Sequence, residues 1–102
     1  MFIAMNRFKV VLGSEEAFEN VWKNRESRLT EVPGFQDFKL LKGPEADDHR
    51  LYASHTIWRT RDDFEAWTKS EHFRMAHRDA GDNKAKYLGH PQFEGFEIVL
   101  EE

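Results

Sequence analysis

Apolar and polar residues alternate over residues 2–12, and this two-residue period predicts a β-strand at the start of the chain. One side of the predicted strand is apolar except at Asn6: Phe2, Ala4, Phe8, Val10 and Leu12. The other side mixes Ile3, Met5 and Val11 with basic residues, so we expect this strand to be in contact on both of its faces.

A helical period follows Gly13. Ser14 is a favoured N-cap residue, and the glutamates after it have the sign that suits the first turn of a helix. The predicted helix carries an apolar stripe with one cation inside it: Phe18, Val21, Trp22, Arg25 and Leu29. We expect Pro33–Gly34 to end this helix.

The rest of the chain predicts two hairpin strands, a helix, a loop and a last strand. The strands are expected at 35–41 and 51–58, with a turn that contains Gly43–Pro44 and Asp47–Asp48. Thr60 to Asp63 resembles a capping box that opens a helix carrying Phe64 and Trp67. Residues 79–91 are expected to form a loop, and residues 93–100 the fourth strand.

The segment WTKSEHFRMAH, from Trp67 to His77, predicts a helix that breaks and restarts. A continuous helix would separate its two ends by about 15 Å, whereas a new N-cap at Ser70 lets Trp67 and His77 approach one pocket. Phe73 and His77 lie one turn apart, so the imidazole shares a helix face with a ring. A single imidazole beside an apolar slot suits a haem iron.

The element order β-α-β-β-α-β predicts an α+β fold of the ferredoxin-like, split βαβ type. A single domain spanning residues 1–102 would form a four-stranded antiparallel sheet with its helices on one face. The apolar residues on the uncovered face then need a partner: Ile3, Met5, Val11, Phe35 and Leu41. A second copy of the chain, packed sheet to sheet as a homodimeric β-barrel, is the expected solution.

Composition narrows the class of function. The net charge of −4 argues against nonspecific nucleic-acid binding, and the sequence has no apolar run long enough for a membrane span. The absence of cysteine excludes an Fe–S cluster and a thiol nucleophile, and a cytoplasmic location is expected. Aromatic residues make up 14% of the chain, which indicates a ring-rich core or a pocket for a flat apolar ligand.

Each candidate residue has an ordinary structural interpretation when it is taken alone. Asn6 fits a core amide that hydrogen-bonds a neighbouring backbone group. His77 fits a satisfied core histidine, and Trp67 fits a core ring. Arg25 fits a side chain whose stem covers the core while its guanidinium reaches water.

The combination of Asn6–Arg7 on the first strand with the W-x-x-S-x-x-F-x-x-A-H segment resembles the IsdG-like haem-degrading monooxygenases. These belong to the antibiotic biosynthesis monooxygenase superfamily of dimeric ferredoxin-like barrels. The resemblance implies haem as both cofactor and substrate, cleavage of the porphyrin with O2, and release of iron for iron acquisition. It also implies electrons from an external donor, either a reductase or a small reductant, because the sequence has no Rossmann glycine fingerprint.

The resemblance assigns three catalytic residues. His77 would be the axial ligand of the haem iron, Asn6 would hydrogen-bond oxygen on the opposite side of the ring, and Trp67 would press the porphyrin out of plane. Further cofactor contacts are expected from Trp22 and Phe73 along the pocket, and from Arg25 to a propionate, with Arg74 and Arg78 as other candidates for that role.

Two other functions remain open from the sequence. A cofactor-free monooxygenase could use Asn6, Trp67 and His77 on an aromatic polyketide or quinone-like substrate. A dimeric barrel could also bind haem without degrading it, since one fold hosts several activities.

Overall fold

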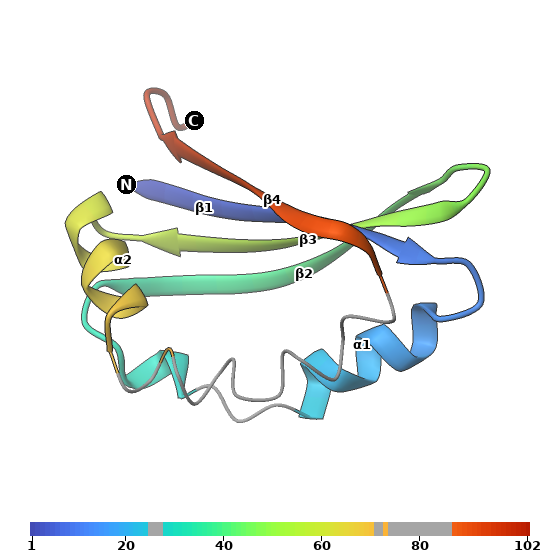
Figure 1. Cartoon of the computed structure of the whole chain (residues 1–102). Coiled ribbons are helices and arrows are strands. Elements are labelled where there is room, and N and C mark those ends of the chain that lie inside the picture. The colour runs from blue at the N-terminus through green and yellow to red at the C-terminus, as the bar shows by residue number, and fades with distance from the viewer. Residues whose placement is uncertain (25–27, 71–72, 74–86) are drawn as a thin grey trace.

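The computed structural model describes residues 1–24, 28–70, 73 and 87–102. Its elements are β1 (Phe2–Val11), α1 (Glu15–Asn24), the 3-10 helix η1 (Leu29–Glu31), β2 (Phe35–Glu45), β3 (His49–Trp58), α2 (Arg61–Thr68) and β4 (Tyr87–Glu97). All strand pairs are antiparallel, and the strand order is β2-β3-β1-β4. Both α-helices lie on one side of the sheet (Figure 1). The predicted α+β, ferredoxin-like fold is confirmed.

The helix-facing side of the sheet carries two separate aromatic clusters. The α2 cluster consists of Phe2, Ala4, Leu29, Val32, Trp58 and Trp67. The α1 cluster consists of Phe8, Val10, Phe18 and Tyr52. In Figure 1, α2 and α1 lie near opposite ends of the strands, which places the two clusters apart along the sheet.

The first helix is shorter than the sequence predicts. It ends at Asn24 rather than near Pro33, and Arg28 has a left-handed backbone with φ of 51° that a continuous helix cannot contain. Leu29 belongs to η1 and is buried in the α2 cluster, whereas Phe18 is buried in the α1 cluster. The apolar stripe therefore serves two different clusters, and a straight helix could not deliver its two ends to both.

The hairpin formed by β2 and β3 is longer than predicted, because Gly43 and Pro44 lie inside β2 and the turn is limited to residues 46–48. A register shift after Lys42 accommodates the extra residues, and Pro44 is tolerated because β2 is an edge strand.

A second register shift in β2, between Phe35 and Asp37, puts Phe35 on the helix-facing side of the sheet. There its ring packs edge-on against Trp58, with ring centroids 5.8 Å apart. The expectation that Phe35 lies on the uncovered face was wrong.

The capping residues of the second helix were predicted correctly. The hydroxyl of Thr60 accepts a hydrogen bond from the backbone N–H of Asp63 at 3.1 Å, and α2 ends at Thr68. Beyond this end, Ser70 Oγ accepts a hydrogen bond from the Phe73 backbone N–H at 3.2 Å, which is the N-cap contact expected for a restarted helix. The rest of that predicted helix lies outside the described residues.

The last strand begins earlier than predicted, at Tyr87, and ends at Glu97. The ring of Tyr87 packs against Phe8 in the α1 cluster, with centroids 5.5 Å apart, and this contact ties the start of β4 to the core. The turn residues that suggested a loop are accommodated by an irregularity opposite β1, where Gly89 has a positive φ of 66°. Residues 79–86 of the predicted loop lie outside the described residues.

The other side of the sheet has no helix over it in the described part of the chain (Figure 1). One apolar row near the first residues of β1 joins Phe96, Ile3 and Ile57 across β4, β1 and β3. Phe96 is 44% exposed, and Leu41 on β2 is 38% exposed. None of the helices that the structure describes is long and apolar enough to cross a membrane.

Candidate functional site

Asn6 lies on the helix-facing side of β1, between Ala4 of the α2 cluster and Phe8 of the α1 cluster. The residue is half-buried, and its pairing partners are Ser54 on β3 and Phe93 on β4. Its side chain makes no hydrogen bond to the part of the chain that the structure describes. The interpretation of Asn6 as a core amide that binds a neighbouring backbone group is thus not supported, and its amide can serve a ligand.

Trp67 forms a fixed wall on the α2 side of Asn6. It occupies the last turn of α2, is 7% exposed, and lies among three other rings. Its ring centroid is 4.8 Å from Phe73 in an edge-on contact and 5.2 Å from Trp58. Because these rings fix one another, the tryptophan is held in place before any ligand arrives.

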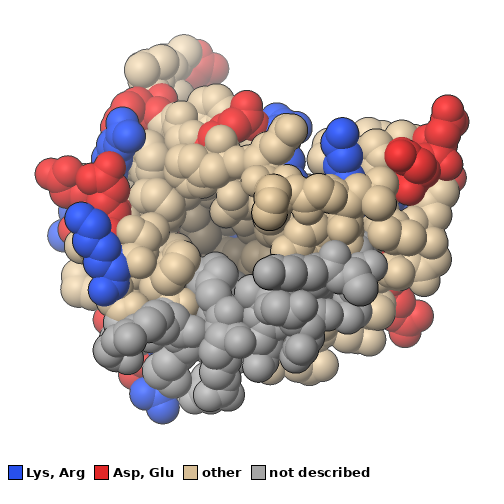
Figure 2. Space-filling view, viewed as in Figure 1, with Lys and Arg blue, Asp and Glu red and all other residues tan. Residues whose placement is uncertain are grey.

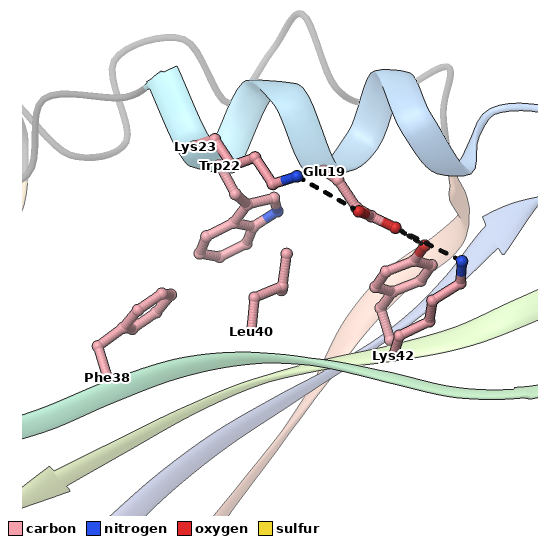
Figure 3. Close-up of a pocket in the computed structure, with 7 residues that line it drawn as sticks. Glu19, Trp22, Lys23, Phe38, Leu40 and Lys42 are labelled. Carbon is pink, nitrogen blue, oxygen red and sulfur yellow. Dashed lines mark hydrogen bonds and ion pairs between the residues drawn. The ribbon is translucent and has the colours of Figure 1, made fainter.

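Trp22 and a cavity lie on the α1 side. Trp22 projects from α1 and stacks on Phe38 of β2, with ring centroids 5.8 Å apart and planes at 19° (Figure 3). A cavity of about 240 Å³ beside this stack is lined by Glu19, Trp22, Lys23, Phe38, Leu40, Lys42 and Tyr52. Small-molecule pockets commonly span about 300–1,000 Å³, so this cavity on its own is too small for a porphyrin.

A charged network lines part of this cavity. The hydroxyl of Tyr52 donates a hydrogen bond to Glu19 Oε2 at 2.5 Å, and Lys42 and Lys23 approach the same carboxylate at 3.8 and 3.7 Å (Figure 3). The hydrogen bond from Tyr52 is the main cause that holds the pKa of Glu19 below its usual value, and burial opposes it. Burial, followed by the bond to Glu19, raises the pKa of the Tyr52 phenol.

The structure brings four of the predicted site residues to one side of the sheet. Asn6 lies in the middle, Trp67 and Phe73 lie on the α2 side, and Trp22 lies on the α1 side. Figure 2 shows the molecule hollowed beneath the strands, between the α2 end and the α1 end. The predicted roles of His77, Arg25, Arg74 and Arg78 fall on residues outside the described part of the chain.

Within the described ranges, no group of three or more His, Cys, Asp or Glu side chains is placed to hold a metal ion. A free amide between two aromatic walls can hydrogen-bond an oxygen atom of a flat apolar ligand while the rings exclude water from it.

Sequence reasoning missed three residues of this region: Ser54, Glu19 and Phe38. Ser54 is buried on β3 directly opposite Asn6. The sequence pattern that could have indicated it is the series of side chains with polar groups along one side of the strand: Tyr52, Ser54, Thr56 and Trp58. Glu19 was hidden among the acidic residues that coat the first helix. Phe38 needed the register of β2 before its contact with Trp22 could be recognised.

The chain matches the family described as antibiotic biosynthesis monooxygenase over residues 1–79, and it belongs to that family. Asn6, Trp22, Trp67 and Phe73 all lie within the matched residues, so the candidate site belongs to a monooxygenase family.

Among its relatives are proteins of Bacillus thuringiensis and Bacillus anthracis named haem-degrading monooxygenase. Each is 29% identical over 94 residues, with 85% of this chain and 87% of the relative covered.

Two solved structures show the range of chemistry on this fold. A serine-for-arginine variant of MhuD, a haem degrader of Mycobacterium tuberculosis, holds two manganese protoporphyrin IX molecules per active site. It is 25% identical, with a TM-score of 0.79, and covers 100% of this chain and 98% of its own. A variant of SnoaB, a cofactor-independent oxygenase from Streptomyces nogalater, is 23% identical with a TM-score of 0.71, covering 98% and 94%. The resemblance to haem-degrading proteins is confirmed.

We expect Tyr52→Phe to lower the free energy of unfolding by about 1.5–3 kcal/mol near neutral pH, because it removes a hydrogen bond to a charged group. A carboxyl whose pKa is lowered by folding stabilises the protein above its unfolded-state pKa and loses that contribution as the pH falls through the folded value. The difference between the two proteins should therefore shrink below the ordinary glutamate pKa of 4.5. Urea titrations from pH 7 to pH 3 measure it, and a difference that grows on acidification would contradict the assignment.

Proposed function

We propose that this protein is a haem-degrading monooxygenase: it binds haem beneath the sheet and cleaves the porphyrin with O2 and external electrons, releasing iron. The observation that carries the proposal is the Asn6 amide, which lacks a hydrogen bond in the described part of the chain and stands between two aromatic walls. The names of the Bacillus relatives and the porphyrin-bound MhuD structure support this choice within the family.

The residues present fit a bound porphyrin. Its faces are flat and apolar, and the half-buried rings of Phe73 and Trp22 supply matching surface on two sides of Asn6, with the buried ring of Trp67 packed against Phe73. When bound, haem supplies the iron at which O2 is activated and is itself the molecule consumed. His77 would hold the iron from one side, and Arg25 would pair with a propionate.

The residues of the chain then have separate tasks. The Asn6 amide would donate a hydrogen bond to an oxygen atom and orient it without giving up a proton. Trp67 is fixed between Trp58 and Phe73 and would press on the ring from that position. The aromatic clusters exclude water from the centre. An external reductase or small reductant in the cytoplasm would supply the electrons.

We further propose that the uncovered side of the sheet is paired with a second copy of the chain. That side combines exposed Phe96 and Leu41 with two ion pairs, Arg7 with Glu94 and Lys39 with Asp37. Each of these ion pairs is neutral as a pair, so neither by itself opposes the approach of a second copy related by a two-fold axis. The row of Phe96, Ile3 and Ile57 would then form the apolar core of the interface.

Titration of the purified protein with haemin tests the haem proposal. We expect a shifted Soret band that saturates stoichiometrically, because the apolar site and one imidazole take up the ring. His77→Ala should remove the shift, and His90→Ala, which changes an exposed histidine on β4, should leave it unchanged. If haemin does not bind the wild-type protein, the cofactor-free monooxygenase becomes the better explanation.

Asn6→Ala separates the enzyme from a haem-binding protein without turnover. We expect this variant to bind haemin like the wild type but to bleach the Soret band about 100-fold more slowly when a reductant is added in air. The factor is typical for the loss of one hydrogen-bond donor aimed at a reacting oxygen. Released iron, measured with a ferrous chelator, should fall in parallel. A wild-type complex that keeps its Soret band under these conditions would refute the enzymatic role.

Sedimentation analysis tests the second copy. We expect the wild type to have twice the 12.1 kDa mass of one chain, and Phe96→Glu to shift it toward the monomer, because a buried carboxylate would face its own copy or apolar residues. Val99→Glu is the matched control, since Val99 lies beyond β4 and is 94% exposed. A monomeric wild type, or equal effects of both variants, would contradict the interface.

A further inference from the structure

The helix-facing side of β3 carries four residues with polar groups: Tyr52, Ser54, Thr56 and Trp58. Three of these groups have partners inside the fold. Tyr52 donates to Glu19, Trp58 Nε1 donates to Thr56 Oγ1 at 3.0 Å, and Thr56 Oγ1 donates to the Ala4 carbonyl at 3.2 Å. These bonds anchor the ends of the row to the helix α1 and to β1.

Ser54 differs from its three neighbours. It is 7% exposed, yet its hydroxyl makes no hydrogen bond with the residues that the structure describes. Alanine would fill nearly the same volume, so the packing described here does not require a hydroxyl at this position. The hydroxyl at this position therefore needs an explanation beyond packing.

The register places Ser54 directly opposite Asn6. Opposed residues of antiparallel strands have Cβ atoms about 4.5–5.5 Å apart on the same face of the sheet. Both side chains lie on the helix-facing side, and neither bonds to the other. Their outer neighbours in the same row are apolar, Leu40 beyond Ser54 and Phe93 beyond Asn6. The two polar groups thus form one patch between the α2 cluster and the α1 cluster.

We propose that Ser54 is a second ligand-orienting residue of the haem site, with its hydroxyl acting beside the Asn6 amide on the same small ligand in the pocket. This inference rests on the proposed haem function. An amide and a hydroxyl set side by side can offer two donors, or a donor and an acceptor, to one oxygen-containing or anionic ligand. Two contacts fix the direction of such a ligand, whereas one contact leaves it free to rotate.

The test compares azide binding and carbon monoxide spectra in haemin complexes of three proteins. Ser54→Ala removes the hydroxyl at the site. Thr56→Val is the matched control, because it removes a hydroxyl from the same row whose bonds lie within the fold. We expect all three proteins to bind haemin alike, and Ser54→Ala alone to bind azide to the ferric complex about 3- to 10-fold more weakly, as the loss of one hydrogen bond predicts.

A spectroscopic measurement separates a contact to the ligand from a structural effect. The C–O stretching frequency of the reduced complex should shift in Ser54→Ala, return toward the wild-type value in Ser54→Thr, and stay unchanged in Thr56→Val. Thr56→Val should instead lower the thermal stability of the apoprotein, because it leaves the Trp58 indole without its acceptor. Asn6→Ala and the double variant complete a cycle, in which non-additive losses of azide affinity are expected for two groups that share one ligand.

Three results would overturn the proposal. The first is that Ser54→Ala does not differ from the wild type in azide affinity and C–O frequency. The second is that Thr56→Val changes both quantities as much as Ser54→Ala does. A wild-type protein that fails to bind haemin would overturn the haem function together with this inference, whereas normal haemin binding with no effect of Ser54→Ala would overturn this inference alone.

Discussion

The pairing of β1 with β3 that sets Asn6 opposite Ser54 is the constraint on which the rest of the structure depends. It puts two polar side chains in the middle of a layer that is otherwise built from rings and aliphatic groups. An apolar core cannot close over such a pair without a cost, so the core forms as two clusters, one on each side. Each helix packs on one cluster, and α1 and α2 therefore lie apart on the sheet (Figure 1).

The aromatic residues turn this divided core into a site with fixed walls. On one side, Trp67 is held between Trp58 and Phe73. On the other side, the stack of Trp22 on Phe38 links the two clusters along the β2 edge, because Trp22 packs against the α1 cluster and Phe38 against the α2 cluster. Large rings that contact one another in this way lose little further freedom when a flat ligand binds, so the site is largely preorganised.

The sequence predicted those parts of the fold that depend on local chemistry. Alternation located β1, and the N-cap contacts of Thr60 and Ser70 were read correctly from single side chains. The errors arose where tertiary contacts override local preference. Arg28 turns the chain out of the helix so that Leu29 can join the α2 cluster, and Tyr87 starts β4 early because its ring packs on Phe8. In the site, Asn6 was visible because it broke an apolar row, but the significance of Ser54 depends on a partner 48 positions away in the sequence, and only the strand register reveals it.

Five side chains on this side of the sheet keep a single protonation state near neutral pH: Asn6, Ser54, Thr56, Glu19 and Tyr52. The amide of Asn6 and the hydroxyls of Ser54 and Thr56 do not titrate near neutral pH. Glu19 and Tyr52 do titrate, but their contact lowers the pKa of the carboxyl and raises the pKa of the phenol, which moves both further from neutrality. Of these groups, Asn6 and Ser54 are the ones not engaged by bonds within the described fold, so they are the groups able to orient an oxygen atom, and neither readily passes it a proton. This property suits the oxygenase function proposed above, because the polar groups beside the substrate would hold an oxygen atom in one direction without protonating it.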